Sequence, residues 1–105
     1  MLKSIQSKLL QSILNEVRMS IINQLLSREE NIADLSKKLK IERSKLCYHL
    51  NILASENIVN SKYVILEEAH SKGKAGKVYS INQSRFKEAK KVLENFKNEV
   101  DKLGS

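Results

Sequence analysis

Apolar residues recur every three or four positions over most of this chain, which is the spacing that one face of an α-helix requires. The first such segment covers residues 2–14 and includes Ile5 and Leu9. Asn15 follows as a capping residue for a second helix that runs to about Leu26. The amino-terminal part of the chain therefore predicts two successive helices.

A short third helix is predicted after Asn31, because Asn commonly caps helix amino termini. Asp34 lies in its first turn, where a carboxylate interacts favourably with the helix dipole. Leu35 and Leu39 lie on its apolar face. A turn at residues 40–42 then leads into a fourth helix.

The fourth helix has an unusual polar face. At about 100° per residue, Leu46, Leu50 and Leu53 fall on one narrow stripe. His49 lies at the edge of this stripe. The opposite face carries small, neutral or hydrogen-bonding residues, namely Ser44, Cys47, Tyr48, Asn51 and Ser55. Such a face fits the floor of the DNA major groove without bulk or like-charge repulsion, so this helix is predicted to read DNA. Asn57, which tolerates positive φ, is predicted to end it.

The apolar period then changes from that of a helix to that of a strand. Residues 59–68 and 77–82 are rich in β-branched side chains and Tyr, and they flank a Gly-containing loop at 69–76. This pattern predicts a β-hairpin. Three lysines without an accompanying acid lie in the loop and at the start of the second strand: Lys72, Lys74 and Lys77. The hairpin is therefore predicted to be a basic wing that contacts phosphates or the minor groove.

The last segment, residues 84–103, predicts a helix with a narrow apolar seam. Its apolar residues are spaced 3, 4, 3, 4 and 3 positions apart: Phe86, Ala89, Leu93, Phe96, Val100 and Leu103. A seam this narrow favours packing against another helix, here a symmetry mate. Packing on the first helix of the same chain remains the alternative. The residues predicted at the dimer interface are Ile5, Leu9, Phe86, Leu93, Phe96 and Val100.

Together these elements predict a single mainly α-helical domain over residues 1–105, with the order α-α-α-α-β-β-α and a small β-hairpin. The helix-turn-helix covers 31–57 and the wing 59–82. Residues 1–14 and 84–103 form the predicted dimerisation helices. A chain of 105 residues has room for one modest core, which agrees with one domain.

The charge distribution supports a polyanionic partner. The chain carries a net charge of +7, and its hydrophobic fraction of 41% is ordinary for a globular protein. Residues 37–45 hold five basic residues and one acidic residue, giving +4 next to the fourth helix. Arg43 and Lys45 open that helix beside amide groups that also favour phosphate. Duplex DNA is therefore the expected partner.

Other classes of function find little support. One cysteine allows no internal disulfide, and no apolar run is long enough to span a membrane. A polar amino terminus does not resemble a signal peptide, so a cytoplasmic location is expected. No catalytic arrangement, phosphate-binding loop or metal cluster occurs, so we expect no enzymatic activity and no cofactor. Cys47 beside basic residues leaves a redox switch as a minority alternative to a packing role. His49 and His70 are interpreted as a semi-buried residue and an exposed loop residue.

Several segments resemble the ArsR-type winged helix-turn-helix repressors. The resemblance covers residues 15–82. It rests on Asn15-Glu-Val-Arg-Met-Ser-Ile-Ile-Asn-Gln-Leu-Leu26, Ile32-Ala-Asp-Leu-Ser-Lys-Lys-Leu39, Ser44-Lys-Leu-Cys-Tyr-His-Leu-Asn-Ile-Leu53 and Gly76-Lys-Val-Tyr79. It implies a homodimer built on the terminal helices, operator binding and often release by an effector. Ser44, Lys45, Cys47, Tyr48 and His49 correspond to the DNA-proximal part of the motif.

The chain also departs from the family pattern. Lys40 replaces the usual Gly at the turn, which implies a different or strained turn. The paired-cysteine metal motif of the third helix is absent, and residues 84–105 contain no His or Cys. The resemblance therefore implies no metal sensing.

The predicted function is sequence-specific binding of double-stranded DNA by a homodimer that regulates transcription, most simply as a repressor on a palindromic operator. The predicted DNA contacts are Arg43, Ser44, Lys45, Cys47, Tyr48, Asn51, Lys72, Lys74 and Lys77. The alternative is a winged-helix module for protein–protein contact or for non-specific DNA coating. Neither an effector nor the sign of regulation follows from the residues.

Overall fold

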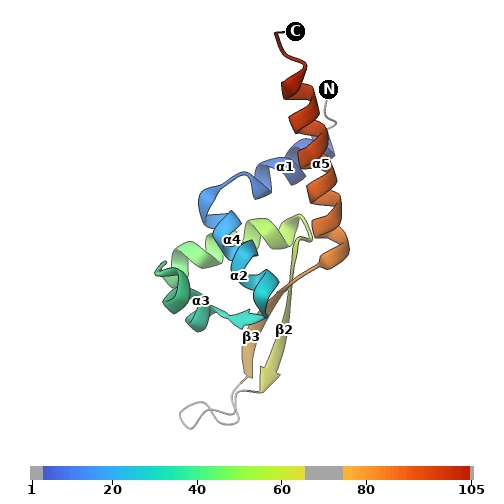
Figure 1. Ribbon diagram of the computed structural model, residues 1–105. Coiled ribbons are helices and arrows are strands. Elements are labelled where there is room, and N and C mark those ends of the chain that lie inside the picture. Colours follow the sequence, from blue (N-terminus) through green and yellow to red (C-terminus); the bar gives the residue numbers. More distant parts are fainter. Residues whose placement is uncertain (1–3, 66–74, 105) are drawn as a thin grey trace.

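A computed structural model describes residues 4–65 and 75–104, in which helices surround the upper end of a narrow sheet (Figure 1). The elements are α1 (Ser4–Ile13), α2 (Glu16–Ser27), β1 (Glu30–Asn31), α3 (Ile32–Leu39), α4 (Arg43–Ser55), β2 (Val59–Ile65), β3 (Ala75–Ile81) and α5 (Gln83–Asp101). Helices α1 and α5 lie side by side at one end of the molecule, and the β2–β3 hairpin forms the other end. The predicted fold class, mainly helical with a small hairpin, is confirmed.

The predicted element order was incomplete, because the sheet has three strands in the order β1-β3-β2. Glu30 pairs with Tyr79 and Asn31 with Val78, so the segment before α3 lies along the free edge of β3. The observed order is α-α-β-α-α-β-β-α. A strand of two residues is too short to show an alternating pattern, and its pairing partner lies far away in the sequence.

The predicted helix boundaries are confirmed by their capping groups. The side chain of Asn15 accepts a hydrogen bond from the Arg18 amide at 3.0 Å, and that of Asn31 accepts one from the Asp34 amide at 2.8 Å. Asn57 has a φ of 62°, as expected for the residue that ends α4. Asn82, which the sequence reading left without a role, caps α5 in the same way.

The core lies where the helices meet the upper end of the sheet. Its fully buried large side chains come from α1, α2, α3, α4 and the residue just before β2: Leu9, Ile21, Leu35, Leu46, Leu50, Leu53 and Ile58. Leu9 was predicted at the dimer interface, but it is only 2% exposed and packs inside the chain. The reason is that the first helix is amphipathic towards its own domain, so its apolar face is already covered.

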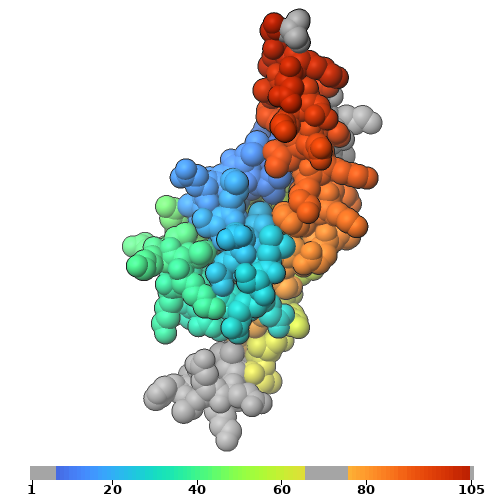
Figure 2. Space-filling view, viewed as in Figure 1, coloured from blue at the N-terminus to red at the C-terminus, as the bar shows by residue number. Residues whose placement is uncertain are grey.

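The seam of α5 has two parts with different surroundings. Ala89 is fully buried, and Val92, beside the seam, is only 8% exposed, in a helix that packs on α1. The predicted outward-facing seam was therefore wrong at Ala89. Further along, Leu93, Phe96 and Val100 are 38%, 37% and 45% exposed. The carboxyl-terminal part of α5 projects beyond the body of the protein, as the space-filling view shows (Figure 2).

Candidate nucleic-acid interface

Helix α4 turns the predicted apolar stripe inward. Leu46, Leu50 and Leu53 are at most 1% exposed, which fixes the rotation of the helix about its axis. Tyr48 is 63% exposed on the other side. The other predicted contact residues of this helix are also exposed: Arg43, Ser44, Lys45, Cys47 and Asn51. The predicted rotation is confirmed, and it leaves the whole polar face free for a ligand.

The turn between α3 and α4 places the basic end of α4 at the surface. Lys40 adopts the left-handed conformation, with φ 57° and ψ 45°, which favours Gly. The Ser36 hydroxyl donates to the Ile41 carbonyl at 2.6 Å, and the Ile41 amide donates to the Ser36 carbonyl at 3.3 Å. These bonds hold the turn closed, so Arg43 begins α4 in a defined position.

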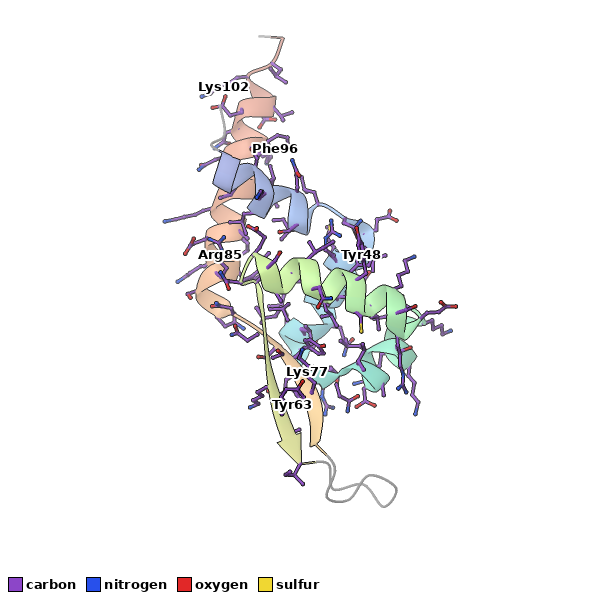
Figure 3. All side chains as sticks on the ribbon, turned by 180° about the vertical axis from the view of Figure 1, so that it is seen from behind. Tyr48, Tyr63, Lys77, Arg85, Phe96 and Lys102 are labelled. Carbon is purple, nitrogen blue, oxygen red and sulfur yellow. The ribbon has the colours of Figure 1, made fainter. Side chains whose placement is uncertain are left out.

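The hairpin carries a basic and aromatic surface below the helices. Strands β2 and β3 pair from Val59 opposite Ile81 to Ile65 opposite Ala75, which places Tyr63 opposite Lys77. The Lys77 ammonium lies 6.0 Å from the ring centre of Tyr63 and 5.6 Å from that of Tyr79. Figure 3 shows Tyr63 and Lys77 together on the hairpin. Lys72, Lys74 and His70 lie outside the described residues.

Tyr63 is a surface residue that sequence reasoning missed. Its side chain is 73% exposed, although a large aromatic ring is costly to leave in water. The sequence alone did not place it, because the predicted loop at 69–76 puts Glu68 opposite Lys77, whereas the observed register puts Tyr63 there. An exposed ring beside an ammonium group suits contact with a sugar or a phosphate.

His49 is buried at the inner edge of α4 and is held by Arg18. Nη1 of Arg18 lies 2.9 Å from Nδ1 of His49, and the same guanidinium donates to the backbone carbonyls of Ser12 and Gln11. Burial, reinforced by the positive charges of Arg18 and Lys45, lowers the pKa of His49 below its usual 6.5. The interpretation of His49 as a semi-buried residue with satisfied hydrogen bonds is confirmed.

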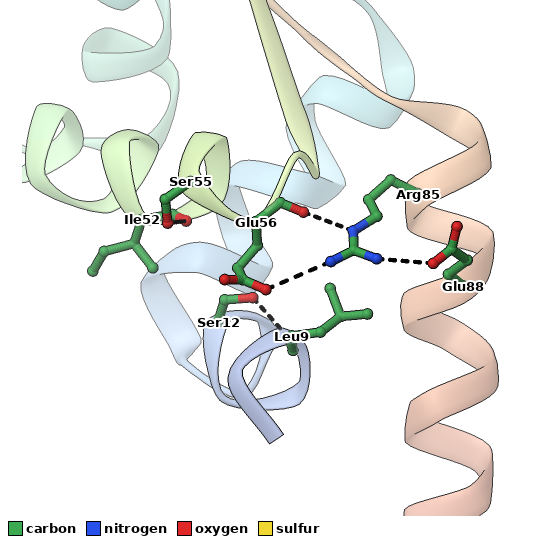
Figure 4. Close-up of polar contacts among 7 residues, drawn as sticks. All are labelled: Leu9, Ser12, Ile52, Ser55, Glu56, Arg85 and Glu88. Atoms are coloured by element: carbon green, nitrogen blue, oxygen red, sulfur yellow. Dashed lines mark hydrogen bonds and ion pairs between the residues drawn. The ribbon is translucent and has the colours of Figure 1, made fainter. Parts of the chain in front are cut away.

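The carboxyl-terminal end of α4 is tied to α5 by Arg85 (Figure 4). Its Nε donates to the Glu56 carbonyl at 2.7 Å, and its Nη2 lies 3.6 Å from the Glu56 carboxylate. Its Nη1 donates to Glu88 at 2.8 Å. The side chain of Arg85 is 20% exposed, so these bonds are partly shielded from water. The end of α4 therefore cannot move independently of α5.

A buried carboxylate fixes α3 against the edge of the sheet. The side chain of Glu30 is 1% exposed and lies 2.6 Å from the Lys38 ammonium and 3.3 Å from the Arg28 guanidinium. The Gln24 amide donates to it at 3.0 Å. Its charge is therefore balanced by two cations and stabilised by one further hydrogen bond, and we interpret Glu30 as structural.

Residues 4–65 and 75–104 contain neither a candidate metal site nor a membrane-spanning helix. No group of three or more His, Cys, Asp and Glu residues within these ranges could hold a metal ion. Cys47 is exposed on α4 as a free thiol. Of the helices described, none is long and apolar enough to cross a bilayer.

A second surface, remote from the polar face of α4, is apolar. It consists of the exposed stripe of α5 and an adjoining groove of about 540 Å³ between α2 and α5. The apolar residues that line the groove are Ile13, Leu14, Met19, Ile22, Leu26, Phe86 and Leu93. Leu93 belongs to both the stripe and the groove, so the two form one continuous surface. The side chain of Ile5, also predicted at the interface, lies outside the described part.

The fold, with its exposed α4 and its hairpin, is that of a winged helix-turn-helix protein, and comparisons with known proteins show which type it resembles. Residues 15–61 match the model of the bacterial regulatory proteins of the ArsR family. No curated protein sequence matches the chain significantly. The resemblance found in the sequence is therefore confirmed over this segment, which is similar to the ArsR-family transcriptional regulators.

Solved structures extend the likeness beyond the matched segment. A transcriptional regulator homologue from Pyrococcus horikoshii is 25% identical, with a TM-score of 0.66 and coverage of 90% of each chain. The regulator HlyU from Vibrio vulnificus is 23% identical, with a TM-score of 0.59 and coverage of 86% of this chain and 85% of its own. An ArsR-like regulator from Rhodococcus is 18% identical, with a TM-score of 0.67 and coverage of 93% and 84%. The last two likenesses concern the fold alone.

Proposed function

We propose that this protein is a homodimeric transcriptional regulator that binds a palindromic DNA operator in a sequence-specific manner, most simply as a repressor. The exposed polar face of α4 carries this proposal. It offers hydroxyl, phenol and amide groups from Ser44, Tyr48 and Asn51, while Arg43 and Lys45 flank them with positive charge. Hydrogen-bonding side chains read base edges, and cations bind phosphates.

The hairpin supplies the second part of the proposed interface. Lys77 and Tyr63 are exposed on it, and Lys72 and Lys74 belong to the same basic segment of the sequence. Flexible ammonium groups bind phosphate without reading sequence. We therefore assign affinity mainly to the wing and sequence choice mainly to α4.

Dimerisation is assigned to the apolar stripe of α5 with the groove beside it. Leu93, Phe96 and Val100 are large side chains that a monomer leaves more than one-third exposed. A two-fold interface on this surface covers each of them in both chains. It also sets the separation of the two α4 helices, which must match half-sites about 34–36 Å apart.

Selection of bound sequences from a random duplex library tests this function directly. A specific regulator enriches one palindromic sequence, and it prefers that sequence over random competitor DNA by at least about 10³-fold at physiological salt. Uniform binding to all duplexes would instead identify a DNA-coating protein. Failure to bind any duplex, with the fold intact, would leave the wing and α4 as a protein-docking surface.

A further inference from the structure

Three helices meet at the guanidinium group of Arg18. This residue belongs to α2, yet its Nε and Nη2 donate to the carbonyls of Ser12 and Gln11 in the last turns of α1. Its Nη1 contacts Nδ1 of His49 in α4 at 2.9 Å. A single side chain thus connects the helix that begins the chain with the helix that carries the proposed reading face.

The contact with His49 requires a neutral imidazole. Arginine has only hydrogen-bond donors and stays protonated, so Nδ1 of His49 must be the acceptor and the ring proton must lie on Nε2. A second proton on the ring would turn Nδ1 into a donor that faces another donor at 2.9 Å. Two positive charges at this distance repel each other strongly in a partly buried position.

The surroundings offer the protonated ring little compensation. The charged groups that act on His49 are Arg18 from α2 and Lys45 from α4, and both are positive. The ring of Tyr48 meets it edge-on, with ring centres 5.1 Å apart. Lys8 of α1 and Glu56 line the shallow hollow next to Arg18, where Glu56 is already engaged by Arg85.

We propose that Arg18 is a positioning residue for DNA recognition, which holds α4 against α1 through its contact with a neutral His49. The inference rests on the proposed function, since it concerns how the reading face is oriented. Loss of the contact leaves α4 packed through its leucines but frees its orientation relative to α1 and α2. Operator binding, which needs a defined orientation in both chains, is therefore weakened more than non-specific binding.

The inference predicts an unusual dependence on pH. A histidine near DNA ordinarily strengthens binding when it becomes positive, because it adds a phosphate contact. Here protonation breaks the contact, so operator affinity falls in acid. The pKa of His49 is lowered, so the loss begins below 6.5, as pH falls towards the pKa of the folded protein. Below that pKa, affinity can fall by up to about tenfold per pH unit for each chain.

Matched variants separate this effect from general electrostatics. In His49→Gln, an amide oxygen can accept a hydrogen bond from Arg18 at every pH, so operator affinity at neutral pH is kept. The loss of operator affinity in acid that is caused by residue 49 disappears. In His70→Gln, which removes the other histidine, the loss of operator affinity in acid persists. Arg18→Gln loses at least about tenfold in preference for the selected duplex over random DNA at neutral pH, which corresponds to about 1.4 kcal/mol. Arg18→Lys keeps the charge but not the three-way contact, and it gives the same loss.

The readout is fluorescence anisotropy with the selected duplex and with a scrambled one, on samples whose fold is checked by circular dichroism. Equal pH profiles for the parent and His49→Gln, or full operator preference in both Arg18 variants, would overturn the inference. If selection yields no preferred duplex, the proposed function fails and the contact itself is still testable. The pKa of His49, measured by NMR in the free protein, must then rise in Arg18→Gln, and an unchanged pKa would refute the contact.

Discussion

Substitution of Phe96 by Asp is the sharpest test of how this protein assembles. Phe96 lies in the middle of the exposed stripe of α5, with Leu93 on one side and Val100 on the other. Figure 3 shows it on the projecting part of α5, far from the wing. A change there should affect assembly without touching the polar face of α4.

The expected size of the effect follows from the area that Phe96 leaves exposed. A phenylalanine side chain that is 37% exposed presents about 70 Å² to water. Covering that area contributes roughly 1.5–2 kcal/mol per chain, and a two-fold interface contains it twice. The lost area alone therefore weakens the dimer by roughly 3–4 kcal/mol, or more than about a hundredfold. Two carboxylates near the symmetry axis add a desolvation cost.

Light scattering and a gel shift on the same sample provide the measurement. We expect Phe96→Asp to be monomeric at concentrations where the parent is dimeric, and to lose tight binding to a palindromic operator. Asn98→Asp is the matched control, since it adds the same group to an exposed position on another face of α5. Phe96→Ala should show an intermediate loss without added charge. A stable Phe96→Asp dimer with parental DNA affinity would place the interface elsewhere.

Three further predictions concern the reading face, the wing and the turn. Tyr48→Ala and Ser44→Ala should each weaken operator binding in titrations by roughly 1–3 kcal/mol per lost base contact. Tm should change little, because both side chains are exposed. A variant with parental affinity would show that its residue does not determine sequence recognition. Replacing the three wing lysines by Ala should weaken all duplexes alike and reduce the slope of log K against log salt by up to about 3 units for each chain, and an unchanged slope would refute the wing assignment. Lys40→Gly should raise the free energy of unfolding in urea by up to about 1 kcal/mol, because φ is 57° there, and a loss of stability would contradict the argument from strain.

Local signals in the sequence predicted local structure well. The caps at Asn15, Asn31 and Asn57 depend on a side chain and a backbone only a few residues apart, so residue type and spacing were sufficient. The rotation of α4 was predicted for the same reason, because three leucines at helical spacing define one buried side. These features determine which side chains the candidate interface can present.

Non-local contacts escaped prediction. Strand β1 exists only because Glu30 and Asn31 pair with β3, almost fifty residues further along the chain. The covered part of the α5 seam also depends on tertiary structure: Ala89 and Phe96 occupy equivalent positions in the repeat, but Ala89 is fully buried and Phe96 is 37% exposed. A heptad pattern identifies an apolar stripe that must pack against another helix. It does not show at which residue of the stripe one packing partner gives way to another.

The two arginines that sequence reading left without a role explain how the two candidate surfaces depend on each other. Arg18 connects the middle of α4 to α1, and Arg85 connects its end to α5. Neither residue lies on the polar face of α4 or on the apolar stripe of α5. Because α5 carries the proposed assembly surface and contacts α1, each arginine links that surface to the reading helix, Arg85 directly and Arg18 through α1. A regulator that recognises two half-sites must fix the distance between its reading helices as well as their chemistry. In this chain the leucines of α4 determine which side chains face outward, and the two arginines determine where those side chains lie relative to the assembly surface.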